Sequence, residues 1–246
     1  MEISKLDWLQ VKNITGTKAD VYFYGEIVSD SWDKWADTDT CPQDVLDILE
    51  EVKGKELDIY INSPGGSVFA GYAIYNILSR VKEKKICYID GVAGSIASVI
   101  CMVGDEIIMP SNSYLMVHKP SNIIWGNATE MRKMADDLDT IQIGIENVYK
   151  NKLNDGVDIE VIRGLMDKES WLPASEASKY FKVKLVEENT SINKLSKDSF
   201  KNYNNLPYNL KDFISENKVN KDLENNIKEN KDFKNKLQAE LELLSL

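Results

Sequence analysis

The sequence has few of the residues that build metal sites and disulfide frameworks. It contains three cysteines, Cys41, Cys87 and Cys101, and a single histidine in 246 residues. Three cysteines cannot all pair with one another, and none has the Cys-x-x-Cys or Cys/His spacing of a zinc site. We therefore expect free thiols in a reducing compartment, and no metal ion or other cofactor.

The chain also lacks a long hydrophobic run and a basic surface. Its N-terminal segment, MEISKLDWLQVKN, has no apolar signal core. The longest apolar run, residues 92–103, is shorter than the roughly 20 residues that span a bilayer. The formal net charge of −10 and the pI near 4.8 argue against a protein that binds nucleic acid through its phosphates. These absences predict a cytoplasmic protein with no membrane or nucleic-acid partner.

Composition divides the chain near residue 190. Before that point, β-rich runs alternate with helical patterns, as in ELDIYINS followed by SVFAGYAIYNILSRV, and this alternation is typical of a parallel, helix-covered sheet. Residues 191–246 are rich in Asn and carry ten Lys against nine Asp and Glu, a composition that buries too little apolar surface to fold alone. We predict an α/β domain over residues 1–190 and a charged tail over residues 191–246.

The end of the tail has a weak helical periodicity. Apolar residues recur at mostly helical spacing from Leu223 to Leu244, with a break between Ile227 and Phe233. The pattern fits a solvated helix with a few exposed apolar residues, and it also fits a helix that docks on another copy or on a partner. We expect the tail to be partly helical or disordered, and dispensable for folding of the domain.

A long amphipathic helix is predicted after Asn127. Asn127 and Glu130 have the spacing of a capping box, and apolar residues repeat every three or four positions over residues 131–148. This stripe is flanked by charged residues. We therefore expect it to be buried between subunits, with Ile141 and Ile145 in the interface.

Small residues gather where a buried strand runs into an apolar helical segment, in YIDGVAGSIASVICMVG, residues 88–104. Ser95 occupies this corner. Serine is favoured at helix N-termini because its side-chain oxygen accepts hydrogen bonds from free N–H groups, so Ser95 could be a cap and nothing more. It could also be a nucleophile, with Ser98 as the next candidate for that role.

A Pro-Gly-Gly turn follows another predicted strand, in INSPGGSVFAG. Gly65 and Gly66 leave the backbone bare at the carboxyl end of the strand, where parallel α/β proteins bind their ligands. Their N–H groups could point at an oxygen anion. A plain strand-to-helix turn explains the same residues equally well.

The only histidine, His118, ends a further apolar run, SYLMVH. A serine nucleophile needs a base with a pKa near neutral, which histidine supplies, although a lone histidine is often structural. Such a base needs an acceptor to fix its tautomer, and Asp167 and Glu169 are available in LMDKESW. In a strand both carboxylates could face His118, whereas in a helix they would point about 200° apart. Either acid could equally be a surface charge.

Together these segments resemble the Clp protease proteolytic-subunit family. The family's INSPGG turn is present unchanged at residues 61–66, and GVAGSI at residues 91–96 looks like its serine corner. MVHKP at residues 116–120 resembles the family's MIHQP, and WLPASEA at residues 171–177 is similar to the run that follows its catalytic acid. The four motifs stand in the family's order, and the resemblance covers roughly residues 15–190.

The resemblance implies a crotonase-like ββα spiral and the activity of a serine endopeptidase on protein and peptide substrates. Carried over by motif, Ser95 is the nucleophile, His118 the base, and the N–H groups of Gly66 and Ile96 the oxyanion hole. The helix after Asn127 matches the handle through which subunit rings face one another, so a homo-oligomeric ring is expected. An unfoldase partner is also possible for this family, and the chain has no G-x-x-x-x-G-K-[ST] loop of its own.

Several positions depart from the family's pattern. Ile96 stands where the family usually has Met. This change is tolerated if the residue acts only through its backbone N–H group. In a gapless match through Trp171 the catalytic acid falls on Glu169, where the family has Asp, while Asp167 lies two residues too early. We favour register over residue type and expect Glu169 to orient His118, with Asp167 as the alternative.

The tail and the ESWLPASEA segment resemble most the branch of the family found in tailed phages and prophages. That branch implies a head maturation protease whose partners are capsid and scaffold proteins. Two alternatives remain open on the same fold. One is a catalytically silent capsid-assembly scaffold, and the other is an acyl-CoA hydratase or isomerase, which would have no use for Ser95 and His118.

Overall fold

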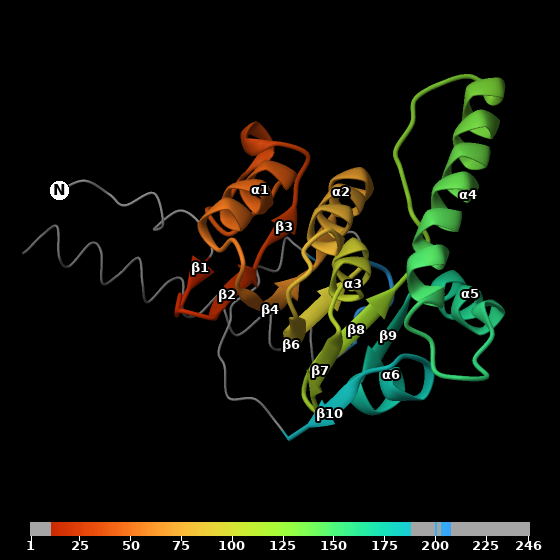
Figure 1. Ribbon diagram of the computed structural model, residues 1–246. Coiled ribbons are helices and arrows are strands. Elements are labelled where there is room, and N and C mark those ends of the chain that lie inside the picture. The colour runs from red at the N-terminus through yellow and green to blue at the C-terminus, as the bar shows by residue number, and fades with distance from the viewer. Residues whose placement is uncertain (1–10, 188–199, 201–202, 208–246) are drawn as a thin grey trace, which may run out of the picture. The chain divides into compact units, whose positions relative to one another are not determined.

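The computed structural model describes residues 11–187, 200 and 203–207 (Figure 1). The chain divides into two compact units, and residues 11–187 and Tyr203–Asn205 all belong to the first. All of the named strands and helices lie in the first unit. The tail helix expected between Leu223 and Leu244 lies outside the described residues.

A mostly parallel sheet forms the centre of this unit. Its central strands, β2, β4, β6 and β7, are all parallel, and β10 extends the sheet in parallel beyond β7. β1 is added antiparallel at the other edge. The bounds of these strands are β1 Val11–Lys12, β2 Lys18–Phe23, β4 Glu56–Ser63, β6 Lys85–Gly94, β7 Glu106–Pro110 and β10 Lys184–Val186.

The sheet branches along its longest strand, β6. The first half of β6 pairs with β7, and its last residues pair in parallel with β8 (Tyr114–Val117), from Val92 opposite Tyr114 to Gly94 opposite Met116. β9 (Ser170–Pro173) then pairs antiparallel with β8. Two short strands, β3 (Glu26–Ile27) and β5 (Gly65–Gly66), form a separate parallel pair. The branch brings the ends of β6 and β8 side by side.

Helices connect successive parallel strands, as the alternating sequence pattern predicts. α1, α2 and α3 follow β3, β5 and β6, and Figure 1 shows them gathered along the sheet. The predicted α/β fold with a parallel sheet is confirmed. The helices span α1 Pro42–Glu51, α2 Val68–Ser79, α3 Ile96–Cys101, α4 Ala128–Lys150, α5 Ile159–Asp167 and α6 Ala174–Tyr180, with a 3₁₀ turn, η2, at Ser31–Asp33.

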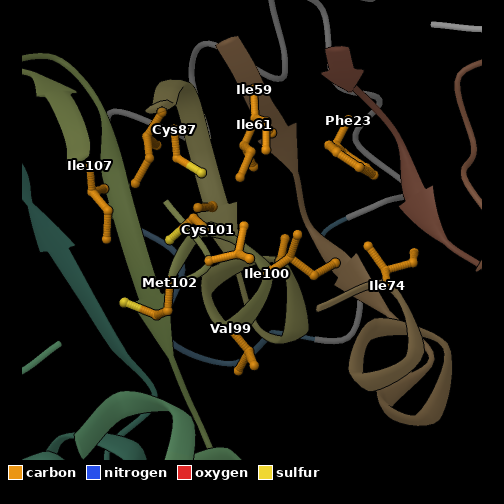
Figure 2. Close-up of a cluster of buried hydrophobic side chains, with 14 of the residues drawn as sticks. Phe23, Ile59, Ile61, Ile74, Cys87, Val99, Ile100, Cys101, Met102 and Ile107 are labelled. Atoms are coloured by element: carbon orange, nitrogen blue, oxygen red, sulfur yellow. The ribbon is translucent and has the colours of Figure 1, made fainter. Parts of the chain in front are cut away.

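The core lies between the sheet and the helix α3, which is buried on every side. A helix that is buried all round belongs in an interior, and Figure 2 shows Ile100 of α3 on the side of the helix that faces the sheet, while Val99 points away from the strands. Cys87 and Cys101 are also buried there, and burial raises the pKa of the Cys87 thiol to about 12. These cysteines are packing residues, because reactivity requires the thiolate.

The predicted long helix is α4. Asn127 caps it by accepting hydrogen bonds from the N–H groups of Thr129 and Glu130, and the Glu130 carboxylate accepts in return from the Asn127 N–H at 2.7 Å. The expectation that Ile145 lies between subunits is wrong, because Ile145 is only 5% exposed and packs in the core of its own unit. Met131, near the other end, is 49% exposed.

Figure 1 shows that α4 projects away from the sheet at the end where Met131 lies, so the two halves of the helix have different surroundings. Among the residues that the structure describes, no helix is both long enough and apolar enough to span a membrane.

Candidate active site

Ser95 sits at the corner between β6 and α3 in a strained backbone conformation. Its φ is +52° and its ψ is −126°, a region that residues with a side chain rarely adopt. Its N–H donates to the Met116 carbonyl of β8 at 3.0 Å, and its side chain makes no capping hydrogen bond to α3. A cap role therefore does not account for Ser95. Strain of this kind is commonly retained where a side chain must be held for function.

His118 follows directly after β8 and meets Ser95. The distance from Ser95 Oγ to His118 Nε2 is 2.7 Å, within the reach required for proton transfer. The contact follows from the topology, because β6 and β8 are parallel neighbours and their carboxyl ends coincide. Burial lowers the pKa of His118 below its usual value, and the negative charge of Glu169 acts in the opposite direction. The imidazole is thus largely neutral near pH 7 and able to accept a proton.

The Gly65–Gly66 strand lies against this corner. Gly65 has a φ of +102°, and a Cβ placed on it would lie only 2.7 Å from the Cβ of Ser95 and 3.1 Å from the Ile96 nitrogen. Gly66 has a φ of +146°, and a Cβ there would lie 2.1 Å from the Ile27 carbonyl oxygen. Only glycine permits this conformation together with this approach. The turn is therefore more than a simple connection, since its backbone directly contacts the serine corner.

The two residues that the resemblance assigns to an oxyanion hole are Gly66 in β5 and Ile96 in α3. The N–H of the next residue, Ser67, donates to the Ile27 carbonyl at 2.7 Å. Ile96 is the first residue of α3, where helical N–H groups have no intrahelical acceptor. Gly66 is exposed, whereas the side chain of Ile96 is buried.

The two candidate acids have different partners. α5 ends at Asp167, whose carboxylate forms an ion pair with Lys119 at 2.6 Å on the surface. Glu169 lies in the following turn with a φ of +49°, so the segment is neither a continuous helix nor a strand across both acids. Among the described contacts, neither acid hydrogen-bonds to His118, although the charge of Glu169 reaches it.

Ser98, the second candidate nucleophile, is fully buried. Its hydroxyl bonds to the Ser95 carbonyl at 2.5 Å and to the Tyr149 hydroxyl at 2.6 Å. These bonds tie α3 to α4 and satisfy the hydroxyl. Ser98 is therefore a structural residue.

Sequence reasoning missed one residue of this site, Tyr203. Its ring stands edge-on to His118, with ring centres 5.4 Å apart, and edge-on to Trp171 at 5.6 Å. Its hydroxyl donates to the Pro64 carbonyl at 2.5 Å. The Asn-rich composition around Tyr203 gives no signal that would distinguish it from the remainder of the tail.

Comparison with known protein families matches residues 25–189 to Clp protease. The chain is 30% identical over 140 residues to an ATP-dependent Clp protease proteolytic subunit of Porphyromonas gingivalis, which covers 55% of this chain and 62% of that protein. It is 34% identical over 149 residues to the subunit of the same name from Chlorella vulgaris, covering 59% and 73%. The chain thus spans less than two thirds of the first of these relatives. The Clp protease domain has a crotonase-like fold, which confirms the predicted fold class.

Proposed function

Because the chain belongs to the Clp protease family, we propose that it is a serine endopeptidase whose nucleophile is Ser95 and whose base is His118. The observation that carries the proposal is the 2.7 Å contact between Ser95 Oγ and His118 Nε2 on a strained strand-to-helix corner. A hydratase or isomerase would have no need for this pair. Peptides and unfolded proteins are the proposed substrates.

The proposed reaction follows the serine protease pattern. His118 Nε2 takes the Ser95 proton as Oγ attacks the scissile carbonyl, and it then gives that proton to the leaving amine. Water, activated by the same imidazole, hydrolyses the resulting ester. The N–H groups of Gly66 and Ile96 are proposed to bind the oxyanion, a contribution of about 3 to 4 kcal/mol per donor in well-studied cases.

Glu169 is the acid that we propose to orient His118. Its charge raises the pKa of the imidazole, as a stabiliser of the imidazolium must, while Asp167 is held by Lys119 on the surface. Closer approach of Glu169 to His118 is expected when substrate is bound, since catalytic hydrogen bonds often tighten only in that complex.

We further propose that the active form is a homo-oligomeric ring assembled through α4. Met131 on the apolar stripe is 49% exposed, and Ile123 and Trp125 on the preceding connection are fully exposed. A group of large exposed apolar residues is typical of protein interfaces.

A cytoplasmic role in phage or prophage head maturation is the finer proposal, with capsid and scaffold proteins as partners. It is supported by the ESWLPASEA segment and the charged tail. An unfoldase would be a further partner. Incubation of the purified protein with capsid and scaffold proteins, with and without ATP and an unfoldase, tests these partners directly.

A fluorophosphonate probe tests the peptidase proposal, because it reacts only with an activated serine. Extended incubation should label the wild type and the Ser111→Ala variant, which changes an exposed serine, but not Ser95→Ala. Labelling should be accompanied by hydrolysis of unstructured peptides. A wild type that neither labels nor hydrolyses any peptide would favour a silent assembly scaffold.

A further inference from the structure

Residues Tyr203–Asn205 contact several segments of the candidate active site that are far apart in sequence. Besides the ring contacts of Tyr203, the Asn205 N–H donates to the Glu169 carboxylate at 2.7 Å. The Asn205 side chain donates to the Lys168 carbonyl at 2.8 Å, and the Asn204 side chain donates to Glu169 at 3.4 Å. These three residues cluster with the protease unit although they lie in the tail sequence.

Tyr203 contacts both residues that the proposed reaction uses, Ser95 and His118. Its ring contacts the proposed base, and its hydroxyl bonds to the carbonyl of Pro64, immediately before the glycine strand. Burial raises the pKa of Tyr203, and a hydrogen bond with the Ser95 side chain opposes that rise. A peptide that reaches the Ser95 hydroxyl must therefore occupy the space that Tyr203 fills.

The contacts also explain why an aromatic side chain is accepted there. The ring planes of Trp171 and His118 make angles of 87° and 76° with the ring plane of Tyr203. This is the edge-to-face geometry that aromatic rings prefer. The Pro64 carbonyl adds an acceptor for a hydroxyl at the far end of the ring. An aliphatic side chain could not make the same set of contacts.

We propose that the active site contains a binding site for an aromatic side chain, bounded by Pro64, His118 and Trp171, and that Tyr203 of the same chain is its resident ligand. The inference rests on the proposed peptidase function and adds a substrate preference to it. Peptides with Tyr, Phe or Trp at the matching position compete for this site, and Tyr203 restrains activity until they displace it.

The tether makes the internal ligand an effective competitor. A segment linked to its own site is present at an effective concentration in the millimolar range, so even a weak contact keeps the site filled. The apparent affinity of an external peptide then falls in proportion to the small fraction of open sites. Removal of the Tyr203 ring should raise that fraction about tenfold or more.

The first experiment measures the rate at which a fluorophosphonate labels Ser95 in the full chain. Tyr203→Ala should label about tenfold or more faster than the wild type. Tyr203→Phe keeps the ring but loses the hydroxyl that bonds to Pro64 and to Ser95, and it should label a few-fold faster. Equal rates in all three proteins would overturn the inference. If circular dichroism shows that Tyr203→Ala is unfolded, the comparison of Tyr203→Phe with the wild type decides the outcome in the same way.

The second experiment measures binding without catalysis. A fluorescent peptide Asn-Tyr-Asn-Asn-Leu, the sequence of residues 202–206, should bind Ser95→Ala/Tyr203→Ala at least about tenfold more tightly than Ser95→Ala alone, by anisotropy. The same peptide with Ala in place of Tyr should bind neither. Equal affinity for the two proteins would contradict the resident-ligand assignment.

The two proposals can fail separately. Ser95 labelling with no difference between Tyr203 variants, and no selective peptide binding, refutes the aromatic site and leaves the peptidase intact. Selective peptide binding with no Ser95 labelling in any variant supports the aromatic site and refutes the peptidase.

Discussion

The Ser95–His118 pair and the Glu169 turn lie in the same site, but the fold holds them in different ways. Ser95 and His118 directly follow two strands that pair with each other, β6 and β8, and the Ser95 N–H donates to a carbonyl of β8. Glu169 stands in a turn between α5 and β9 with a left-handed backbone, and its carboxylate bonds to Asn205. The sheet therefore fixes the first two groups, whereas a local turn positions the third.

This difference indicates where the site can adapt. The ladder between β6 and β8 couples several hydrogen bonds, so it restrains the backbone on both sides of the Ser95–His118 contact. A turn can rotate a carboxylate at little cost to the fold. We therefore expect the acid to be the group that exchanges partners if Tyr203–Asn205 leave the site. Four measurements can challenge that contrast.

The largest effects should come from the strand-end pair. Ser95→Ala and His118→Ala should each lower kcat/KM for a peptide substrate on the order of 10⁴-fold, because the two groups act as a unit. The double variant should lose no more than either single one. Peptide hydrolysis by purified proteins gives the rates, and additive losses would mean that the residues do not act together.

A smaller loss is expected at the turn. Glu169→Gln should lower kcat about tenfold or more, because a neutral amide no longer stabilises the imidazolium. Asp167→Asn is the matched control and should have little effect, since an exposed ion pair such as Asp167–Lys119 contributes little. The reverse ranking would assign the orienting role to Asp167.

α4 shows a similar contrast between a fixed half and an exposed half. Met131→Asp should produce smaller species in sedimentation velocity without unfolding the subunit, because it places a charge in the proposed interface. Asp136→Ala, on the opposite face of the helix, should leave the assembly unchanged. An unchanged mass for both variants would mean that Met131 is not in the interface.

The smallest effect concerns pH. Burial lowers the pKa of His118, so the acid limb of the kcat/KM profile should lie below the ordinary histidine value of about 6.5 and activity should persist as pH falls toward it. Because Glu169 acts to raise this pKa, Glu169→Gln should move the limb to still lower pH. An upward movement would contradict the electrostatic coupling of the two residues.

The sequence alone predicted an α/β fold with a parallel sheet and a strand-to-helix corner at Ser95. Alternating strand and helix patterns, the Asn127 capping box and the glycines at 65 and 66 are local signals, since each depends on residues close together in the chain. The resemblance to a family then related Ser95 to His118. The contact between these two side chains depends on the pairing of the end of β6 with β8, and no local sequence pattern indicates this pairing.

Only the tertiary structure decided which side chains far apart in the sequence contact one another. Asp167 pairs with Lys119, Ile145 packs inside its own unit, and Tyr203 reaches Pro64 across 139 positions of the chain. The sequence around Tyr203 does not indicate such contacts, because periodicity reports only the local backbone. The sequence determined which chemical groups the site could use, and the packing of distant segments decided which of them meet.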